Sequence, residues 1–196
     1  MVKNMKKILV ILGNPKKTSF GRNLAEAYVK GAKAGDFDVR FLDVTAMKFD
    51  PILHEGKDSG QKIEESVLSA RKDIYWANHL VFIYPIWWGS MPAIMKGFIE
   101  RVFSNGFAYK YVKGEAFHRR LLKGKSARLI ITMDASYLLY KLLLREHGVK
   151  SIKINVFFFC GIGPVKTSNI YNVRKSGRES REKWLDRIHG FGVKGL

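Results

Sequence analysis

The stretch KILVILGNPKKTSF, residues 7–20, decides the fold class. Its run of five aliphatic residues, Ile8 to Leu12, is typical of a parallel strand buried on both faces. Gly13-Asn14-Pro15 ends that strand, and Thr18 or Ser19 is suited to cap the helix expected next. A buried strand that leads through a short loop into a helix is the start of a β-α-β unit, so we expect an α/β protein.

The remaining sequence repeats this alternation of strands and helices. Strands are expected at 37–44, 79–84, 127–132 and 164–173, and helices at 61–77, 91–103, 136–147 and 178–191. Segment 152–159 is ambiguous, because its β-branched and aromatic residues favour a strand by propensity. The alternation predicts one domain, residues 1–196, with five parallel strands and helices on both faces.

In such a sheet, ligands bind beyond the carboxyl ends of the strands. Three loops of this chain lie there: residues 13–20, 85–91 and 133–140. We therefore look for functional residues in these loops.

The chain is strongly basic. It has 35 Lys and Arg against 17 Asp and Glu among 196 residues, a net charge of +18. Such a charge attracts nucleotides, nucleic acids or an acidic membrane surface, but the cations are spread along the chain, and a generally basic surface fits as well. The 46% hydrophobic share excludes a disordered chain.

The sequence predicts neither a metal centre nor a membrane span. Cys160 is the only cysteine, which fits a reducing compartment, and no Cys/His cluster has zinc spacing. The longest apolar candidate, Val156 to Ile162, is far short of the ~20 residues of a membrane helix. The basic N-terminus faintly resembles a signal peptide, but Pro15-Lys16-Lys17 stands where a cleavage site should be. We expect a cytoplasmic protein.

The first loop has the chemistry of a phosphate site without a known phosphate motif. It lacks the glycines of a P-loop or of G-x-G-x-x-G. The helix that follows offers unpaired N–H groups and partial positive charge, to which Thr18 and Ser19 add hydroxyls and Lys16 and Lys17 add cations. On this stretch alone, an ordinary capped helix start is the favoured interpretation.

The second loop, YPIWWGSMP at 84–92, contains two adjacent tryptophans. Trp87 and Trp88 stand between a strand end and a helix start, where a planar cofactor would lie, and indole rings stack well on conjugated rings. Tryptophans packed beneath a loop would give the same pattern.

The longer run YPIWWGSMPAIMKGFIERVF, residues 84–103, resembles the signature of the flavodoxin-like NAD(P)H:quinone oxidoreductases. Three further segments are similar to that family, in the same order: residues 18–20, 106–111 and 121–125. The resemblance extends over nearly the whole chain. It implies a flavodoxin-like fold with strand order 2-1-3-4-5, a homodimer, and a helix over 152–159 that Gly161 closes.

The resemblance also implies an activity: flavin-dependent transfer of hydride from NAD(P)H to quinones or similar conjugated acceptors by a ping-pong mechanism. FAD is favoured over FMN, because Thr18-Ser19-Phe20 looks like the loop of FAD-binding members. The implied cofactor contacts are Asn14, Thr18, Ser19, Phe20, Pro85, Ile86, Trp87, Trp88, Gly89, Thr132, Met133, Asp134, Arg178 and Arg181. The implied substrate contacts are Trp88 and, across the dimer interface, Tyr109 and Tyr111.

Tyr140 and His147 are the catalytic proton donors that the resemblance implies, although Glu146 is the strict counterpart of the family's histidine. The third loop departs from the family, which usually has T-T-G-G where this chain has Thr132-Met133-Asp134-Ala135. Glycines there let the backbone approach the flavin. Asp134 instead brings a carboxylate near the ring, which would disfavour an anionic reduced flavin.

Two alternatives stay open. A one-electron carrier like flavodoxin would be acidic and would lack the tyrosine-bearing insertion. A basic nucleic-acid or partner-binding protein on a degenerate flavodoxin scaffold is favoured by the altered third loop and the charge of +18, but no recognition motif supports it.

Overall fold

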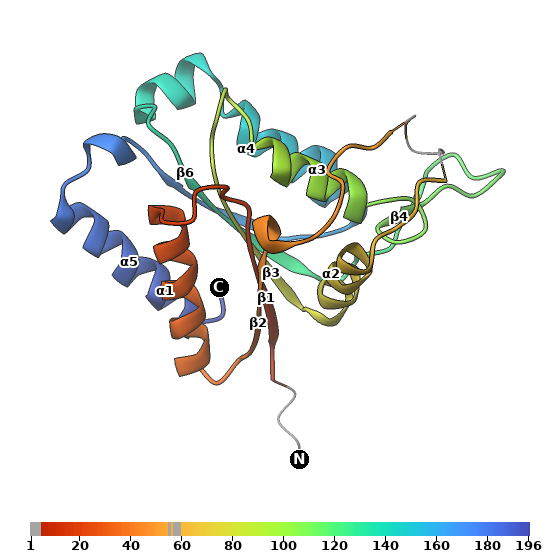
Figure 1. Ribbon diagram of the computed structural model, residues 1–196, viewed down its shortest axis with the longest axis horizontal. Coiled ribbons are helices and arrows are strands. Elements are labelled where there is room, and N and C mark those ends of the chain that lie inside the picture. Colours follow the sequence, from red (N-terminus) through yellow and green to blue (C-terminus); the bar gives the residue numbers. More distant parts are fainter. Residues whose placement is uncertain (1–4, 55, 57–59) are drawn as a thin grey trace.

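A five-stranded parallel sheet runs through the centre of the protein (Figure 1). The computed structural model describes residues 5–54, 56 and 60–196. The strand order is β2-β1-β3-β6-β7, which confirms the predicted order 2-1-3-4-5, because β4 and β5 form a separate ribbon. The strands of the sheet are β1 (Lys7–Leu12), β2 (Asp38–Asp43), β3 (His79–Pro85), β6 (Ser126–Thr132) and β7 (Val165–Ile170).

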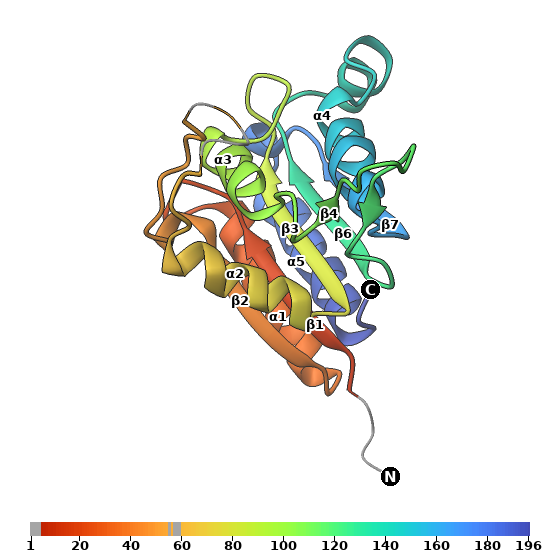
Figure 2. The same cartoon turned by 90° about the vertical axis from the view of Figure 1, so that its right-hand side faces the viewer.

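Helices cover both faces of this sheet (Figure 2). One face packs on α1 (Phe20–Ala34) and α5 (Arg178–Val193), around a core that includes Val10, Ile83 and Ile130. The opposite face has the larger core, which includes Phe82, Phe98 and Phe157. Its helices are α2 (Glu65–Trp76), α3 (Ala93–Val102), α4 (His147–Ser151) and the π-helical η3 (Ile152–Phe158). Two short 3-10 turns, η1 (Val44–Ala46) and η4 (Val173–Lys175), follow β2 and β7.

Two glycines set the separation of α1 and α5. A Cβ atom on Gly31 would lie 2.1 Å from the His189 carbonyl oxygen, and one on Gly192 would lie 2.3 Å from that of Tyr28. Neither position has room for a side chain, so the two helices pack backbone to backbone. These contacts lie toward the C-terminal ends of both helices, whereas the N-terminal ends border the site described below.

Local chemistry moves several helix boundaries from their predicted places. The helix predicted from residue 61 begins at Glu65, and the one predicted from residue 91 begins at Ala93, because Pro92 is the extended residue before its first turn. The stretch 105–125, for which no strand or helix was predicted, contains a two-stranded antiparallel ribbon formed by β4 (Tyr109–Lys110) and β5 (Arg119–Arg120).

The segment between β6 and β7 is helical. Residues 152–159 form η3 and its continuation, closed by Gly161 at φ +90°, so the strand suggested by propensity is wrong and the helix implied by the resemblance is confirmed. The predicted helix over 136–147 is the π-helix η2 (Leu139–Leu143), which ends where Arg145 and Glu146 take left-handed φ angles. In the described part of the chain, no helix combines the length and apolarity needed to span a bilayer.

Candidate functional site

A cleft of about 560 Å³ opens beyond the carboxyl ends of β1, β3 and β6, where the three predicted loops meet. Eleven of the fourteen implied cofactor contacts line it: Asn14, Thr18, Ser19, Phe20, Pro85, Ile86, Trp87, Thr132, Met133, Asp134 and Arg181. Lys16, expected to add positive charge to the first loop, also lines the cleft, and sequence reasoning missed three further lining residues, Gly21, Val173 and Arg174. The other three implied contacts, Trp88, Gly89 and Arg178, lie outside this lining.

The first loop is held by the side chain of Asn14, which is almost fully buried. Its Nδ2 donates to Ser19 Oγ at 3.0 Å, and its Oδ1 accepts from the Lys16 amide at 3.1 Å. Ser19 caps α1, since its Oγ accepts from the Arg22 amide at 3.2 Å. The next two amides, those of Phe20 and Gly21, have no preceding helical turn to bond. They therefore remain available to an anion at the mouth of α1, whose first turn contains no acidic residue.

The second loop is a tight turn from Trp87 to Ser90. The Trp87 amide donates to the Ser90 carbonyl at 2.8 Å, and the Ser90 amide donates to the Trp87 carbonyl at 2.9 Å. The two central residues have positive φ angles, +50° at Trp88 and +77° at Gly89. Trp88 is fully exposed. A left-handed conformation is unusual for a bulky residue, and strain of this kind gathers at functional sites.

Some backbone N–H groups of this loop are hydrogen-bonded within the protein, and others are free to bind a ligand. The Ile86 amide donates to the Thr132 carbonyl at 2.8 Å, so neither it nor the Trp87 amide is free for a ligand. The amides of Trp88 and Gly89 make no hydrogen bond to the part of the chain that the structure describes. Any backbone donation to a planar ring from this turn therefore falls to Trp88 and Gly89.

The third loop is tied to the segment after β7. The Met133 amide donates to the Ile170 carbonyl at 2.9 Å, and the Arg174 amide donates to Asp134 Oδ1 at 2.7 Å. Asp134 is therefore not a bare carboxylate beside the cleft. The hydrogen bond between Asp134 and the Arg174 amide holds the turn at residues 172–174 against the cleft. The cationic side chain of Arg174 therefore lines the cleft.

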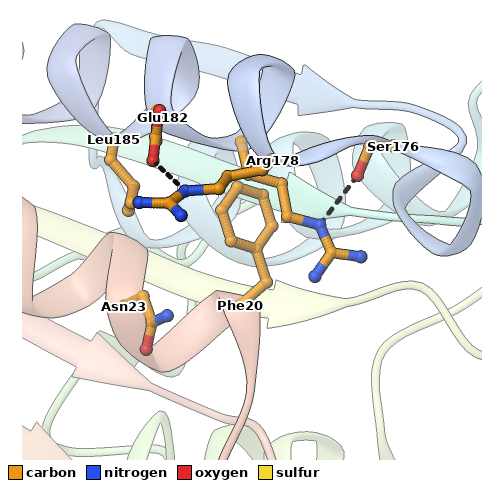
Figure 3. Close-up of a pocket in the computed structure, with 7 residues that line it drawn as sticks. Phe20, Asn23, Ser176, Arg178, Glu182 and Leu185 are labelled. Atoms are coloured by element: carbon orange, nitrogen blue, oxygen red, sulfur yellow. Dashed lines mark hydrogen bonds and ion pairs between the residues drawn. The ribbon is translucent and has the colours of Figure 1, made fainter.

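A second cavity of about 480 Å³ lies between α1 and α5 (Figure 3). It shares Phe20 and Arg181 with the first cleft, so the two adjoin. Arg181 is fixed there, because its Nε donates to Ser176 Oγ at 3.0 Å and its guanidinium lies 5.6 Å from the centre of the Phe20 ring. Arg178 lies in this second cavity and donates to Glu182 at 2.7 Å.

Tyr140 and His147 lie outside the lining of the cleft, in different environments. Tyr140 is fully buried, its hydroxyl has no partner among the described residues, and burial raises its pKa. Tyr84 is buried in the same way, and ionised Tyr140 would add to the effect of burial in raising the Tyr84 pKa. His147 is exposed at the start of α4.

Glu146, the strict counterpart of the family histidine, is the residue beside Tyr140. Its amide donates to the Tyr140 carbonyl at 3.1 Å, and its carboxylate accepts from Asn169 Nδ2 at 3.5 Å. Gly148 brings this segment against the tryptophan turn, because a Cβ atom there would lie 2.5 Å from the Gly89 carbonyl oxygen. Tyr140, Glu146 and the turn are therefore parts of one packed unit.

The implied substrate residues Tyr109 and Tyr111 form an aromatic cluster far from this chain's own cleft. Tyr109 is buried against Tyr111, His118 and Phe159, whereas Tyr111 is exposed. His118 stacks on Phe159 with ring centres 3.7 Å apart and donates from Nε2 to the Phe159 carbonyl at 2.8 Å. Figure 1 places β4 at the opposite end of the molecule from α5, whose Arg181 lines the cleft, and neither tyrosine is among the residues that line it.

A family model for the flavodoxin-like fold matches residues 6–190. The chain belongs to the flavodoxin-like fold family. An uncharacterized NAD(P)H oxidoreductase of Haemophilus influenzae is 34% identical over 163 residues, which cover 81% of this chain and 80% of that protein. NAD(P)H dehydrogenase [quinone] 1 of Cavia porcellus is 28% identical over 216 residues, covering 95% and 78%. The crystal structure of Smu.1420 from Streptococcus mutans UA159 superposes with a TM-score of 0.80 at 32% identity, covering 96% of this chain and 99% of that one.

Proposed function

We propose that this flavodoxin-like protein is a flavin-dependent NAD(P)H oxidoreductase that transfers hydride to quinones or similar conjugated acceptors by a ping-pong mechanism. One observation carries the proposal: a single cleft joins a capped helix N-terminus to an exposed, strained tryptophan turn. The first is suited to a phosphate and the second to a planar ring. The similarity to NAD(P)H oxidoreductases supports the reaction class.

The residues present fit such a cofactor in charge and in size. Three cations, Lys16, Arg174 and Arg181, line the cleft, and Asp134 is the only acidic residue in its lining. The amides at the start of α1 complete an anion site. A volume of about 560 Å³ lies within the range of ~300–1,000 Å³ usual for cofactor and small-molecule sites.

A bound flavin would supply the hydride chemistry, and the protein would supply orientation, hydrogen bonds and exclusion of water. In this proposal the α1 N-terminus and Lys16 bind the phosphate. Pro85, Ile86 and Trp87 border the ring, the free amides of Trp88 and Gly89 donate to its edge, and the Trp88 indole closes the acceptor site. Because donor and acceptor would use the same face in turn, ping-pong kinetics are expected.

Tyr140 is proposed as the group that holds the proton for the acceptor. Burial raises its pKa, so the hydroxyl stays protonated at neutral pH and is able to donate. Glu146, next to it, is a carboxylate that could return the proton to Tyr140, whereas His147 has no polar contact to Tyr140 among the described residues. We keep His147 as a second proton-donor candidate from the resemblance.

FAD rather than FMN is proposed because a second cavity adjoins the first. Arg178 and Arg181 line that cavity, where the distal phosphate and adenosine of FAD would lie. FMN ends at the first phosphate and would leave Arg178, which lines only the second cavity, without a role.

A homodimer in the cytoplasm completes the proposal. Tyr111 is exposed on a packed aromatic cluster outside the lining of its own cleft, so it would line the partner's acceptor site. Cys160 is buried with its pKa raised to about 12, which makes it an inert thiol.

The test is the absorbance spectrum and mass of the ligand that co-purifies with the protein. We expect a yellow protein that contains FAD, is bleached by NADH or NADPH without oxygen, and recovers its colour when menadione is added. Trp88→Ala should bind flavin about fivefold more weakly, because a stacking contact of about 1 kcal/mol is removed. A colourless protein that takes up neither flavin but retards DNA at low salt would refute the proposal and favour the nucleic-acid alternative.

A further inference from the structure

Arg22 lies in α1 next to the first loop, yet it is not one of the residues that line the cleft. Its guanidinium makes two contacts that have no part in the proposed reaction. Nε donates to the Lys17 carbonyl at 2.8 Å, and Nη2 forms an ion pair with the Asp43 carboxylate. Arg22 therefore connects the first loop to the end of β2.

The carboxylate that anchors Arg22 is itself fixed. Asp43 Oδ1 accepts from the Thr45 amide at 3.0 Å and from Thr45 Oγ1 at 2.7 Å, so Asp43 also caps η1. Burial by itself would raise the pKa of Asp43, but the hydrogen bonds from Thr45 and Arg22 outweigh burial and lower it. The carboxylate is therefore charged at neutral pH. Because its side chain is only 15% exposed, the pair with Arg22 is held more firmly than an ion pair in open solvent.

The hydrogen bond to the Lys17 carbonyl sets the direction of the next amide. The peptide between Lys17 and Thr18 is trans and planar, so its C=O and N–H groups point in opposite directions. Because Arg22 binds the carbonyl, the Thr18 N–H is directed away from Arg22. Thr18 lines the cleft, whereas Arg22 does not. The contact therefore leaves the Thr18 amide available on the side of the cleft.

Few other contacts hold this loop. Residues 15–18 are exposed, and their one other hydrogen bond to the described part of the chain joins the Lys16 amide to Asn14 Oδ1. The amides of Lys17, Thr18 and Ser19 make no hydrogen bond to the described residues. Free amides bind an anion tightly only if they are already ordered, because ordering the backbone on binding costs conformational entropy.

We propose that Arg22 is a positioning residue for the flavin phosphate. Anchored on Asp43, it holds the Lys17 carbonyl and so keeps the free amides of the first loop directed at the cleft. Arg22 acts through the loop and not as a ligand, because Asp43 already neutralises its charge. The inference rests on the proposed function and deepens it: Arg22 favours flavins that carry a phosphate, FMN and FAD, over riboflavin, which has the same ring without one.

The test is titration of the flavin-free full chain with FMN, FAD and riboflavin, followed by flavin fluorescence. Arg22→Gln should weaken FMN and FAD binding about tenfold, the effect of losing one charge-assisted hydrogen bond, and should leave riboflavin binding unchanged. Arg22→Lys should weaken FMN binding to a similar degree, because lysine keeps the charge but lacks the planar fork that reaches two acceptors. Full FMN affinity in Arg22→Lys would mean attraction by charge alone and would overturn the proposal.

Asp43→Ala distinguishes the two explanations by the sign of its effect. If charge alone mattered, removing a carboxylate near an anion site would strengthen FMN binding. If Arg22 positions the loop, the same variant releases its guanidinium and weakens FMN binding severalfold. Tighter FMN binding by Asp43→Ala would therefore overturn the proposal.

Arg40 and Asp73 provide a matched control. They form an ion pair at 2.6 Å between β2 and α2, and neither residue lines the cleft. Arg40→Gln and Asp73→Ala should leave FMN binding unchanged. An equal loss in these variants, or an equal loss of riboflavin binding in the Arg22 variants, would mean general damage to the fold and would overturn the proposal.

The same titrations separate this inference from the proposed function. If the original chain binds FMN and FAD and the Arg22 variants bind them equally tightly, the proposed function stands and the role of Arg22 is refuted. If the original chain binds none of the three flavins, the proposed function fails and the inference fails with it.

Discussion

Replacing Trp88 should make the protein more stable and a poorer binder of flavin. Trp88 stands at φ +50° in the turn between Trp87 and Ser90, and its side chain is fully exposed. The left-handed conformation costs an L-residue about 1–2 kcal/mol, and asparagine tolerates it better than most residues. Because the indole packs on nothing that substitution would remove, Trp88→Asn should raise the free energy of unfolding of the flavin-free protein by about 1 kcal/mol.

Trp88→Ala is the control that separates strain from stacking. Alanine retains the Cβ atom, and so the backbone strain, but lacks the indole. We expect its flavin-free stability to equal that of the original chain. Both variants should lose flavin affinity about fivefold, since both lose a stacking contact of about 1 kcal/mol. The stability difference between the two variants therefore reports the strain at position 88 alone.

Urea unfolding of the flavin-free protein and fluorescence titration with FAD measure the two effects. A gain of about 1 kcal/mol corresponds to a rise in melting temperature of about 2–4 °C for a chain of this size. If Trp88→Asn is less stable than Trp88→Ala, the turn is not strained and the reasoning is refuted. If both variants bind flavin as tightly as the original chain, the indole does not contact the ring.

Three other predictions follow from buried or crowded groups. His79 is 4% exposed, and burial and nearby cations lower its pKa from 6.5 to about 3, so below pH 6.5 the unfolded chain binds a proton that the folded chain does not bind. The free energy of unfolding should therefore fall by about 2 kcal/mol between pH 6.5 and pH 5. In urea unfolding at these two pH values, His79→Gln should remove this pH dependence. Gly148→Ala places a Cβ atom 2.5 Å from the Gly89 carbonyl oxygen, so it should lower the free energy of unfolding by about 1–3 kcal/mol and weaken flavin binding. Unchanged flavin affinity in this variant would show that the contact between Gly148 and Gly89 does not shape the flavin site. Tyr84→Phe and Tyr140→Phe each remove a buried hydroxyl without a partner among the described residues, so stability should change by less than about 1 kcal/mol, whereas only Tyr140→Phe should slow quinone reduction; equal rates for both variants would exclude Tyr140 from proton transfer.

Sequence periodicity predicts the sheet because the central strands are continuous apolar runs. Every residue of β3 is buried, as its HLVFIY composition requires. The strand that propensity alone favours at 152–159 can also be rejected on physical grounds. Parallel neighbours such as β6 and β7 need a crossover of a dozen or more residues, usually helical, so a strand ending five residues before β7 had no room to pair in parallel with it.

The loops predicted to form the site do meet, because all three follow carboxyl ends of neighbouring parallel strands. Two features of the site were not predicted from the sequence, one a local turn geometry and the other a matter of tertiary packing. The left-handed φ of Trp88 results from the paired hydrogen bonds between Trp87 and Ser90. The second cavity lies between the N-terminal parts of α1 and α5, two segments that are more than 150 residues apart in the sequence.

The third loop shows why a departure from a family pattern has to be judged in three dimensions. From the sequence, Asp134 adds a negative charge beside a reduced ring. In the fold, the same carboxylate accepts the Arg174 amide at 2.7 Å, and the turn that it holds brings Arg174 itself into the cleft lining. Asp134 therefore holds a cation, Arg174, beside it in the cleft lining, and the net charge of these two residues is zero. The loop without the family's glycines thus makes a hydrogen bond that connects the segments after β6 and β7. The cleft lining as a whole remains positively charged, which suits a phosphate-bearing cofactor.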